Sequence, residues 1–278
     1  MKLFYFYNDD FYPIVKLFLS SIRDNWEIYP VKTDNFNTNL HAGGLNGDKL
    51  RKYVIDYAIK NTQENEIFTI CDTDIYFYKQ LIPVVNDLFN RKQKVLINDN
   101  LIDKDIDILF QKEDRWNGCN MGVMSMRNNS RVIDFWKEVY DKSIPLKLWD
   151  QPIVNQFLYN NLISKTDESS HYADNSRVVW HTFDSNVWNW SLKLNHPFIH
   201  ESLDIILHHA NCVVSKEAKL KQMSIAYDSL LHLSQESHRA KYGFNHEYMS
   251  IYDSECVKEF LEHPKVKPNI VYVHNYSI

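Results

Sequence analysis

The sequence predicts an α/β protein with a mostly parallel sheet flanked by helices and a mainly helical C-terminal extension. Short apolar, strand-like runs alternate with amphipathic helical patterns over most of the chain. Acidic or hydroxyl-bearing residues precede several of those helices, as N-caps do. The 278 residues, 44% hydrophobic and 24% charged, can bury a sizeable core. We expect a main domain at residues 1–215 and an extension at 216–278 packed on it.

The first 71 residues alternate between the two patterns. Aromatic and branched residues fill the strand-like runs, and apolar residues at helical spacing fill the others, as at Ile14, Leu17 and Phe18. The expected elements are a strand at 2–7, a helix capped by Asp9 or Asp10, a strand at 27–31, a loop at 35–47, a helix capped by Asp48 and a strand at 67–71.

The same alternation continues towards residue 208. The expected elements are a helix at 81–89, strands at 94–97 and 121–126, helices beginning at Ser130 and Asp150, and strands at 177–180 and 204–208. After about Ser215 the pattern becomes polar and helical as far as His263, and a short Val-Tyr-Val strand follows.

Charge and cysteine usage exclude several classes. The formal net charge of -5 argues against a broad basic face, so we expect no nucleic-acid partner. The four cysteines are scattered without a Cys-x-x-Cys, which favours a cytoplasmic protein over a disulfide-bonded or zinc-knot one. The apolar run at residues 1–7 is too short for a secretion signal, and no window is long and apolar enough for a transmembrane segment. Nothing in the sequence indicates the oligomeric state.

The strongest chemical signal is Asp72-Thr73-Asp74, directly after the apolar strand at 67–71. On extended backbone both carboxylates point to one side, because side chains alternate with a period of two. Two hard oxygen ligands suit Mg²⁺ or Mn²⁺. An isolated Asp-x-Asp also occurs as a solvated turn, and the position at a strand end favours the metal site.

His208-His209 follows the apolar run Ile205-Ile206-Leu207. Imidazole binds Mn²⁺ well beside carboxylates, so this pair offers a further metal ligand. Alternation along a strand turns only one of the two histidines towards a ligand. The residues leave open whether that one is His208 or His209.

Three weaker signals lie elsewhere in the main domain. Gly122, in Asn120-Met121-Gly122, suggests a close approach of the backbone to another group, or a turn entering a strand. Asp150 fits the role of a helix cap as well as that of a site residue, with Gln151 and a proline following it in the first turn. No Gly-x-Gly-x-x-Gly or Walker sequence is present, so phosphate would be held by metal and by basic side chains such as Lys49.

In this order, the motifs resemble the nucleotide-diphospho-sugar transferases of glycosyltransferase families 8 and 77 over about residues 1–215. The resemblance implies a GT-A (Rossmann-like) nucleotide-sugar-binding and catalytic domain, a UDP-sugar donor, and Mn²⁺ or Mg²⁺ as cofactor. It also implies transfer of a hexose to a hydroxyl of a glycan or protein-linked acceptor, with retention of anomeric configuration. If the enzyme instead inverts, Asp150 or Asp184 could serve as the base.

The resemblance also assigns roles to individual residues. Asp72, Asp74 and His208 match the three metal ligands, and Asp9 and Tyr12 match positions that hold the uracil base. Lys49 matches a basic position near the donor phosphates, and Asp99 and Asn120 match positions that touch the donor sugar. Gln151 matches the residue beside the reacting anomeric carbon, and Asp150 matches its neighbour at the sugar or acceptor.

The chain departs from family 8 after its histidine pair. Ala210-Asn211 stands where Phe-x-Gly is usual, and no Lys-Pro-Trp follows, so the usual pyrophosphate-binding lysine is not identified. Two other classes remain as alternatives. One is a nucleotide-sugar- or carbohydrate-binding protein without catalysis. The other is a Mg²⁺-dependent phosphatase of the haloacid-dehalogenase type, although those enzymes place their aspartates after the first strand of the core.

Overall fold

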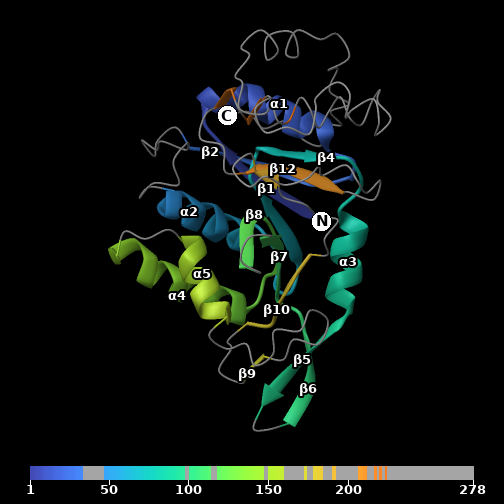
Figure 1. Cartoon of the computed structure of the whole chain (residues 1–278), viewed down its shortest axis with the longest axis vertical. Coiled ribbons are helices and arrows are strands. Elements are labelled where there is room, and N and C mark those ends of the chain that lie inside the picture. The colour runs from blue at the N-terminus through green and yellow to red at the C-terminus, as the bar shows by residue number, and fades with distance from the viewer. Residues whose placement is uncertain are drawn as a thin grey trace.

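A mixed six-stranded sheet forms the centre of the protein (Figure 1). The computed structural model describes residues 1–33, 47–97, 100–113, 118–146, 150–159, 172–173, 178–183, 190–191, 206–211, 216–217, 219–220 and 223. The helices are η1 (Asp9–Phe11), α1 (Tyr12–Ser21), α2 (Gly47–Lys60), α3 (Ile82–Asn90), α4 (Ser130–Leu146) and α5 (Asp150–Tyr159). The strands are β1 (Lys2–Tyr7), β2 (Glu27–Lys32), β3 (Ile67–Cys71), β4 (Ile75–Phe77), β5 (Lys92–Ile97), β6 (Asn100–Asp105), β7 (Ile108–Glu113), β8 (Gly118–Arg127), β9 (Tyr172–Ala173), β10 (Trp180–Thr182), β11 (Trp190–Ser191) and β12 (Leu207–Asn211).

The central sheet has the strand order β10-β7-β8-β3-β1-β2. β1 pairs parallel with β2 and β3, and β10 pairs parallel with β7. β8 runs antiparallel to both of its neighbours, β3 and β7. The expected α/β fold with a mostly parallel sheet is therefore confirmed, with β8 as the antiparallel strand.

Helices lie on both sides of the central strands (Figure 1). In that view α2, α4 and α5 are on the left and α3 is on the right. The faces that they bury are aliphatic and aromatic, for example Leu50 and Val54 of α2 and Trp136 of α4, each at most 2% exposed. Burial of such side chains is the main favourable term in folding.

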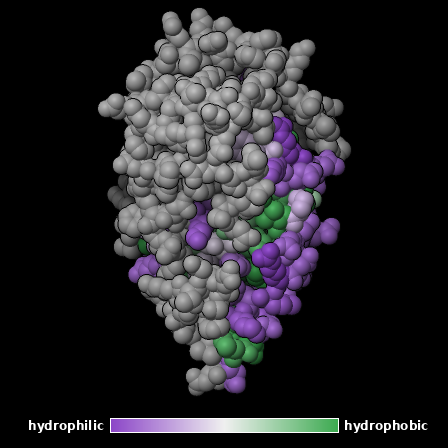
Figure 2. Space-filling view, turned by 45° about the vertical axis from the view of Figure 1, so that its right-hand side comes forward, coloured by the Kyte–Doolittle hydropathy of each residue, from purple (hydrophilic) through white to green (hydrophobic). Residues whose placement is uncertain are grey.

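Two small sheets flank the central one. β12 pairs antiparallel with β4 and parallel with β11. β5, β6 and β9 form the other, at the lower end of the molecule (Figure 1). On the face in Figure 2 the described residues are mainly hydrophilic, with separate apolar patches, one of them at that lower end.

Several element boundaries differ from the sequence predictions. Asn8, rather than Asp9 or Asp10, caps the first helical turn, because its side chain accepts a hydrogen bond from Phe11 N–H. The strands β4, β6 and β7 were not predicted. The histidine pair lies inside β12, which begins at Leu207 rather than at residue 204.

The predicted boundary at residue 215 and the helical extension fall almost entirely outside the described residues. Of the residues described there, Leu220 and Met223 are buried in the main hydrophobic core. Among the described residues, no helix is both long and apolar enough to cross a lipid bilayer.

Candidate functional site

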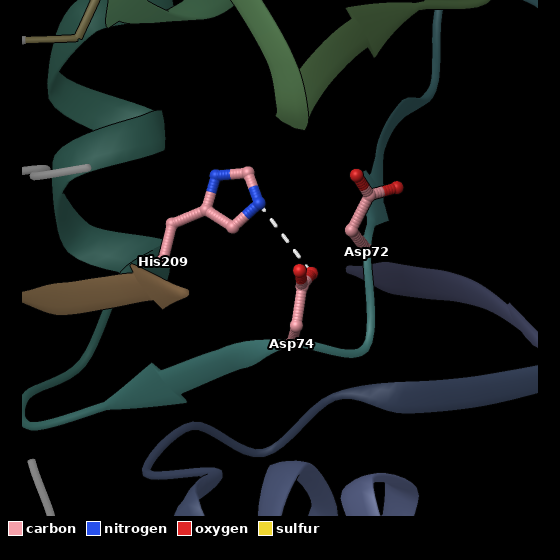
Figure 3. Close-up of side chains that lie close together, drawn as sticks. All are labelled: Asp72, Asp74 and His209. Atoms are coloured by element: carbon pink, nitrogen blue, oxygen red, sulfur yellow. Dashed lines mark ion pairs between the residues drawn. The ribbon is translucent and has the colours of Figure 1, made fainter. Parts of the chain in front are cut away.

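The candidate site forms where the connection from β3 to β4 meets β8 and β12 (Figure 3). β3 ends at Cys71, and Asp72 N–H donates to the carbonyl oxygen of Gly122 on β8 at 2.7 Å. Two residues later, the carbonyl oxygen of Asp74 accepts Ala210 N–H of β12 at 2.8 Å. Backbone hydrogen bonds therefore fix both ends of the Asp-x-Asp segment.

These contacts bring Asp72, Asp74 and His209 together (Figure 3). One ligand atom from each lies within 4.8 Å of the others, and Nε2 of His209 is 3.4 Å from Oδ1 of Asp74. Two carboxylates and an imidazole suit Mn²⁺ or Mg²⁺, with the imidazole favouring Mn²⁺. These three residues thus fit the kind of cation that the sequence predicts.

His208, the metal ligand that the resemblance implies, is not part of this group. It neighbours His209 on β12, where successive side chains point to opposite faces. His208 is fully buried and is aligned with Tyr76 of β4. The structure therefore brings His209, not His208, to the aspartates.

Two basic residues absent from the sequence-based site balance the acidic charge. Nη1 of Arg51 lies 3.3 Å from Oδ1 of Asp72, and Nε of Arg51 lies 3.2 Å from Oδ2 of Asp150. The Lys219 ammonium contacts Oδ2 of Asp74 and donates to the carbonyl oxygen of Ala210 at 3.1 Å. Lys219 thus supplies positive charge beside one of the two carboxylates.

The two aspartates differ electrostatically. Burial raises the pKa of Asp72 above its usual range, and Arg51 opposes this only in part. Burial also acts on Asp74, but Lys219 and His209 outweigh it and lower the pKa of Asp74 below its usual range. Burial lowers the pKa of Arg51, but the charges of Asp72 and Asp150 raise it by more, so the net shift is upward and the guanidinium stays charged.

Of the predicted catalytic pair, Asp150 is linked to Asp72 of the cluster by Arg51, which pairs with both aspartates. It is 7% exposed, and its Oδ1 accepts Gln151 N–H at 2.8 Å, the N–H of the next residue rather than one two or three residues on, as a helix cap would accept. Gln151 is half-buried, and its Oε1 accepts Met121 N–H at 3.4 Å. Both residues therefore connect the start of α5 to β8 and α2.

The predicted donor-binding residues are more dispersed. Asn120 is buried on β8, where its Oδ1 accepts Gly122 N–H at 2.8 Å. Asp9 is exposed and paired with Lys32 at 3.0 Å, and Tyr12 is 52% exposed. Lys49 is exposed on α2, with no contact to the cluster among the described residues. Asp99, and Asp184 as the alternative base, lie outside the described residues.

Arg51 had a signal in the sequence. It falls three, four and seven residues before Val54, Ile55 and Ala58, which form the buried stripe of α2. A basic residue within an apolar helical stripe indicates a buried counter-charge. Lys219 had no such signal, because the segment around it carries no motif.

Comparisons with known proteins bear on the family of the chain. A family model described as nucleotide-diphospho-sugar transferase matches residues 62–223, more than half of the chain. That segment contains the Asp-x-Asp motif, the histidine pair and Lys219. No curated protein matches the chain.

Among solved structures, a glycosyltransferase involved in the glycosylation of the major capsid of PBCV-1 is similar in fold. The TM-score is 0.51 and the identity 15%, covering 81% of this chain and all of the other. The glycosyltransferase GlyE of Streptococcus pneumoniae TIGR4 gives a TM-score of 0.44 at 10% identity, covering 93% of this chain and 63% of the other. The galactosyltransferase LgtC gives 0.45 at 10% identity, covering 85% and 98%.

The family match confirms the resemblance and argues against the phosphatase alternative, and the likeness to the glycosyltransferase of PBCV-1 capsid glycosylation confirms the expected GT-A-type fold. The chain belongs to the nucleotide-diphospho-sugar transferase family of glycosyltransferases.

Proposed function

We propose that this protein is a metal-dependent hexosyltransferase that moves a hexose from a UDP-sugar to a hydroxyl group of a glycan or protein-linked acceptor. The observation that carries the proposal is the convergence of Asp72, Asp74 and His209 at the end of β3. In open α/β sheets, ligands bind outside the carboxyl ends of strands, where this cluster lies.

The three clustered residues would hold Mn²⁺ or Mg²⁺, with His209 as the nitrogen ligand. Such a cation neutralises charge on a diphosphate as it leaves. Lys219 would then be released from Asp74, and its ammonium would remain beside the diphosphate oxygens. Preorganised charge of this kind is usually the largest contribution to catalysis.

The residues around the cluster divide between the two ends of the donor. Asp9 and Tyr12 follow β1 and would hold the uracil base, and the exposed ring of Tyr12 is available for stacking. Asn120 and Gln151 would contact the hexose, and Asp99 would join them. Lys49 would lie nearer the phosphates.

The contacts that Asp150 makes with both of its carboxylate oxygens support transfer with retention of configuration. One of its oxygens accepts Gln151 N–H and the other is paired with Arg51. A general base for inversion would have to give up these contacts while it took the acceptor proton. With retention, a leaving phosphate oxygen takes that proton, and the Gln151 amide oxygen stabilises positive charge at the anomeric carbon.

A panel of UDP-hexoses, incubated with the purified chain and with or without Mn²⁺, tests the proposal through release of UDP. Metal-dependent release from at least one donor is expected. Tight UDP binding without any release, with or without acceptor glycans, would instead indicate the binding protein without catalysis. Wild-type release in the presence of a strong chelator would contradict the metal dependence.

A further inference from the structure

The imidazole of His209 is enclosed by two residues of the central sheet that have no role in the proposed reaction. Gln111 lies on β7 and Gly122 lies on β8. Oε1 of Gln111 is 3.1 Å from Nδ1 of His209. The other ring nitrogen, Nε2, makes the contact with Asp74. The histidine is therefore held from two sides.

An irregularity in the sheet creates this arrangement. Phe110 is aligned with Met124, but the next residue, Gln111, is aligned with Asn120. The intervening segment of β8 bulges out of the ladder, and Gly122 lies within it. Bulges next to active sites commonly re-aim a side chain or a backbone group. Here the bulge presents the Gly122 carbonyl to Asp72 N–H and the Gly122 Cα to the ring of His209.

The lack of room for a side chain explains why residue 122 is a glycine. A Cβ at position 122 would lie 2.2 Å from Cε1 and 2.6 Å from Nδ1 of His209. Contacts that short do not occur in proteins, so any side chain at this position would push the imidazole away from its place beside Asp74. The close approach that the Asn-Met-Gly sequence suggests is thus an approach to the histidine.

The chemistry of Gln111 fixes which nitrogen faces the aspartates. An amide oxygen only accepts hydrogen bonds, so Nδ1 of His209 carries the proton and donates it to Gln111. In the neutral ring with its proton on Nδ1, the lone pair of Nε2 would face a cation held between His209 and Asp74. Histidines that bind metals usually donate their other ring N–H to such an acceptor.

Gln111 is also a costly residue for the core. It is fully buried, and its Nε2 has no hydrogen-bond partner among the described residues. A buried donor without a partner destabilises the folded state, and an apolar residue would avoid that cost. The fold itself therefore gains little from an amide here, whereas the histidine gains an acceptor.

We propose that Gln111 and Gly122 are positioning residues that hold His209 in one ring orientation and one tautomer, with Nε2 presented to the divalent cation. The inference rests on the proposed metal-dependent function. Neither residue touches the cation or the substrate. Loss of either should weaken cation binding before any sugar is present.

The test is a titration of the metal-free full chain with Mn²⁺ alone, in which electron paramagnetic resonance reports free Mn²⁺. We expect Gln111→Met to weaken Mn²⁺ binding by about 10- to 100-fold, the usual effect of losing such a partner. Gly122→Ala should weaken it similarly. Gln111→Glu should bind Mn²⁺ at least as tightly as the wild type, because its carboxylate still accepts from Nδ1.

Ser125→Ala is the matched control. It removes a buried hydrogen bond of 2.7 Å to Thr69 within the same sheet, away from the histidine. Its Mn²⁺ affinity should equal that of the wild type. Near-ultraviolet circular dichroism gives the folded fraction of each variant, so that binding is expressed per folded molecule.

The outcomes separate the two proposals. If the wild type binds Mn²⁺ and both Gln111→Met and Gly122→Ala bind it equally well, the positioning role is wrong and the proposed function stands. If Gln111→Glu binds as weakly as Gln111→Met, the acceptor role of Gln111 is overturned. If the wild type itself binds no Mn²⁺, the metal site fails together with the inference.

Discussion

Arg51 is paired with Asp72, with Nη1 of the arginine 3.3 Å from Oδ1 of the aspartate. The same guanidinium pairs with Asp150 through Nε and donates to the carbonyl oxygen of Met121 at 2.9 Å. One partly buried cation on α2 therefore joins the Asp-x-Asp segment, β8 and the first turn of α5. The proposed metal site and the proposed sugar site share this residue.

Arg51→Met should destabilise the protein by about 3 kcal/mol, because removing one partner leaves buried Asp150 and partly buried Asp72 without their counter-charge. Arg51→Lys should lose less, since it keeps the charge but cannot reach both aspartates with its single ammonium. Urea denaturation of the metal-free chain measures both. Equal stability of Arg51→Met and the wild type would show that the aspartates do not need this cation.

Lys219 is expected to compete with the divalent cation for Asp74. Lys219→Met should tighten the binding of Mn²⁺ alone by about tenfold, or about 1.4 kcal/mol. It should weaken UDP binding in the presence of Mn²⁺, because positive charge beside the diphosphate is lost. Isothermal titration with each ligand measures these two effects.

Lys137→Met is the control for that experiment, since Lys137 is an exposed lysine paired with Asp141 on α4. Both affinities should be unchanged in this variant. Unaltered Mn²⁺ affinity in Lys219→Met would contradict the competition.

Tyr12 is expected to stack on the uracil base. Its ring is 52% exposed, and the Lys16 ammonium lies 4.9 Å from the ring centroid. Tyr12→Ala should weaken UDP binding by about 1–2 kcal/mol, by analogy with base stacking on aromatic side chains. Because so much of the ring is exposed, stability should change little. Tyr53→Ala, at another exposed tyrosine, should leave UDP affinity unaltered, and equal affinity in Tyr12→Ala would refute the assignment.

Gln151→Ala should lower the turnover number more than it changes UDP binding, because the amide oxygen acts mainly in the transition state. Its weak hydrogen bond to Met121 N–H contributes at most about 1 kcal/mol to stability. Steady-state kinetics per folded molecule, with Mn²⁺ at saturation, separates the two. Intact turnover in a destabilised variant would make Gln151 structural, and the catalytic groups would then have to be sought elsewhere.

Much of the fold was predictable because its elements carry local signals. β1 matches its predicted bounds, and the Asp-x-Asp motif does follow the buried strand that ends at Cys71. The missed strand β6 is largely polar, and β7 has three apolar residues followed by Gln-Lys-Glu, so neither pattern repeats with a clear period. The cap at Asn8 was missed because three successive polar residues compete for that role.

The site was less predictable than the fold, because it depends on pairing between distant segments. Alternation predicts that one histidine of the pair faces the aspartates, but the register of β12 on β4 decides which. Nothing in the local sequence connects Lys219 to Asp74, or Gln111 to His209, across 145 and 98 residues. Those contacts come from tertiary structure.

The most direct test of a metal-dependent UDP-sugar transferase compares the wild type with Asp74→Asn in UDP release from the preferred UDP-hexose, over a range of Mn²⁺ concentrations. Asparagine keeps the shape of the side chain and removes the anionic ligand, and the folded fraction is measured in parallel. We expect saturable, Mn²⁺-dependent release by the wild type and at least a 100-fold loss in Asp74→Asn, on the order of 3 kcal/mol in transition-state stabilisation. Wild-type turnover and unchanged Mn²⁺ dependence in folded Asp74→Asn would contradict the account.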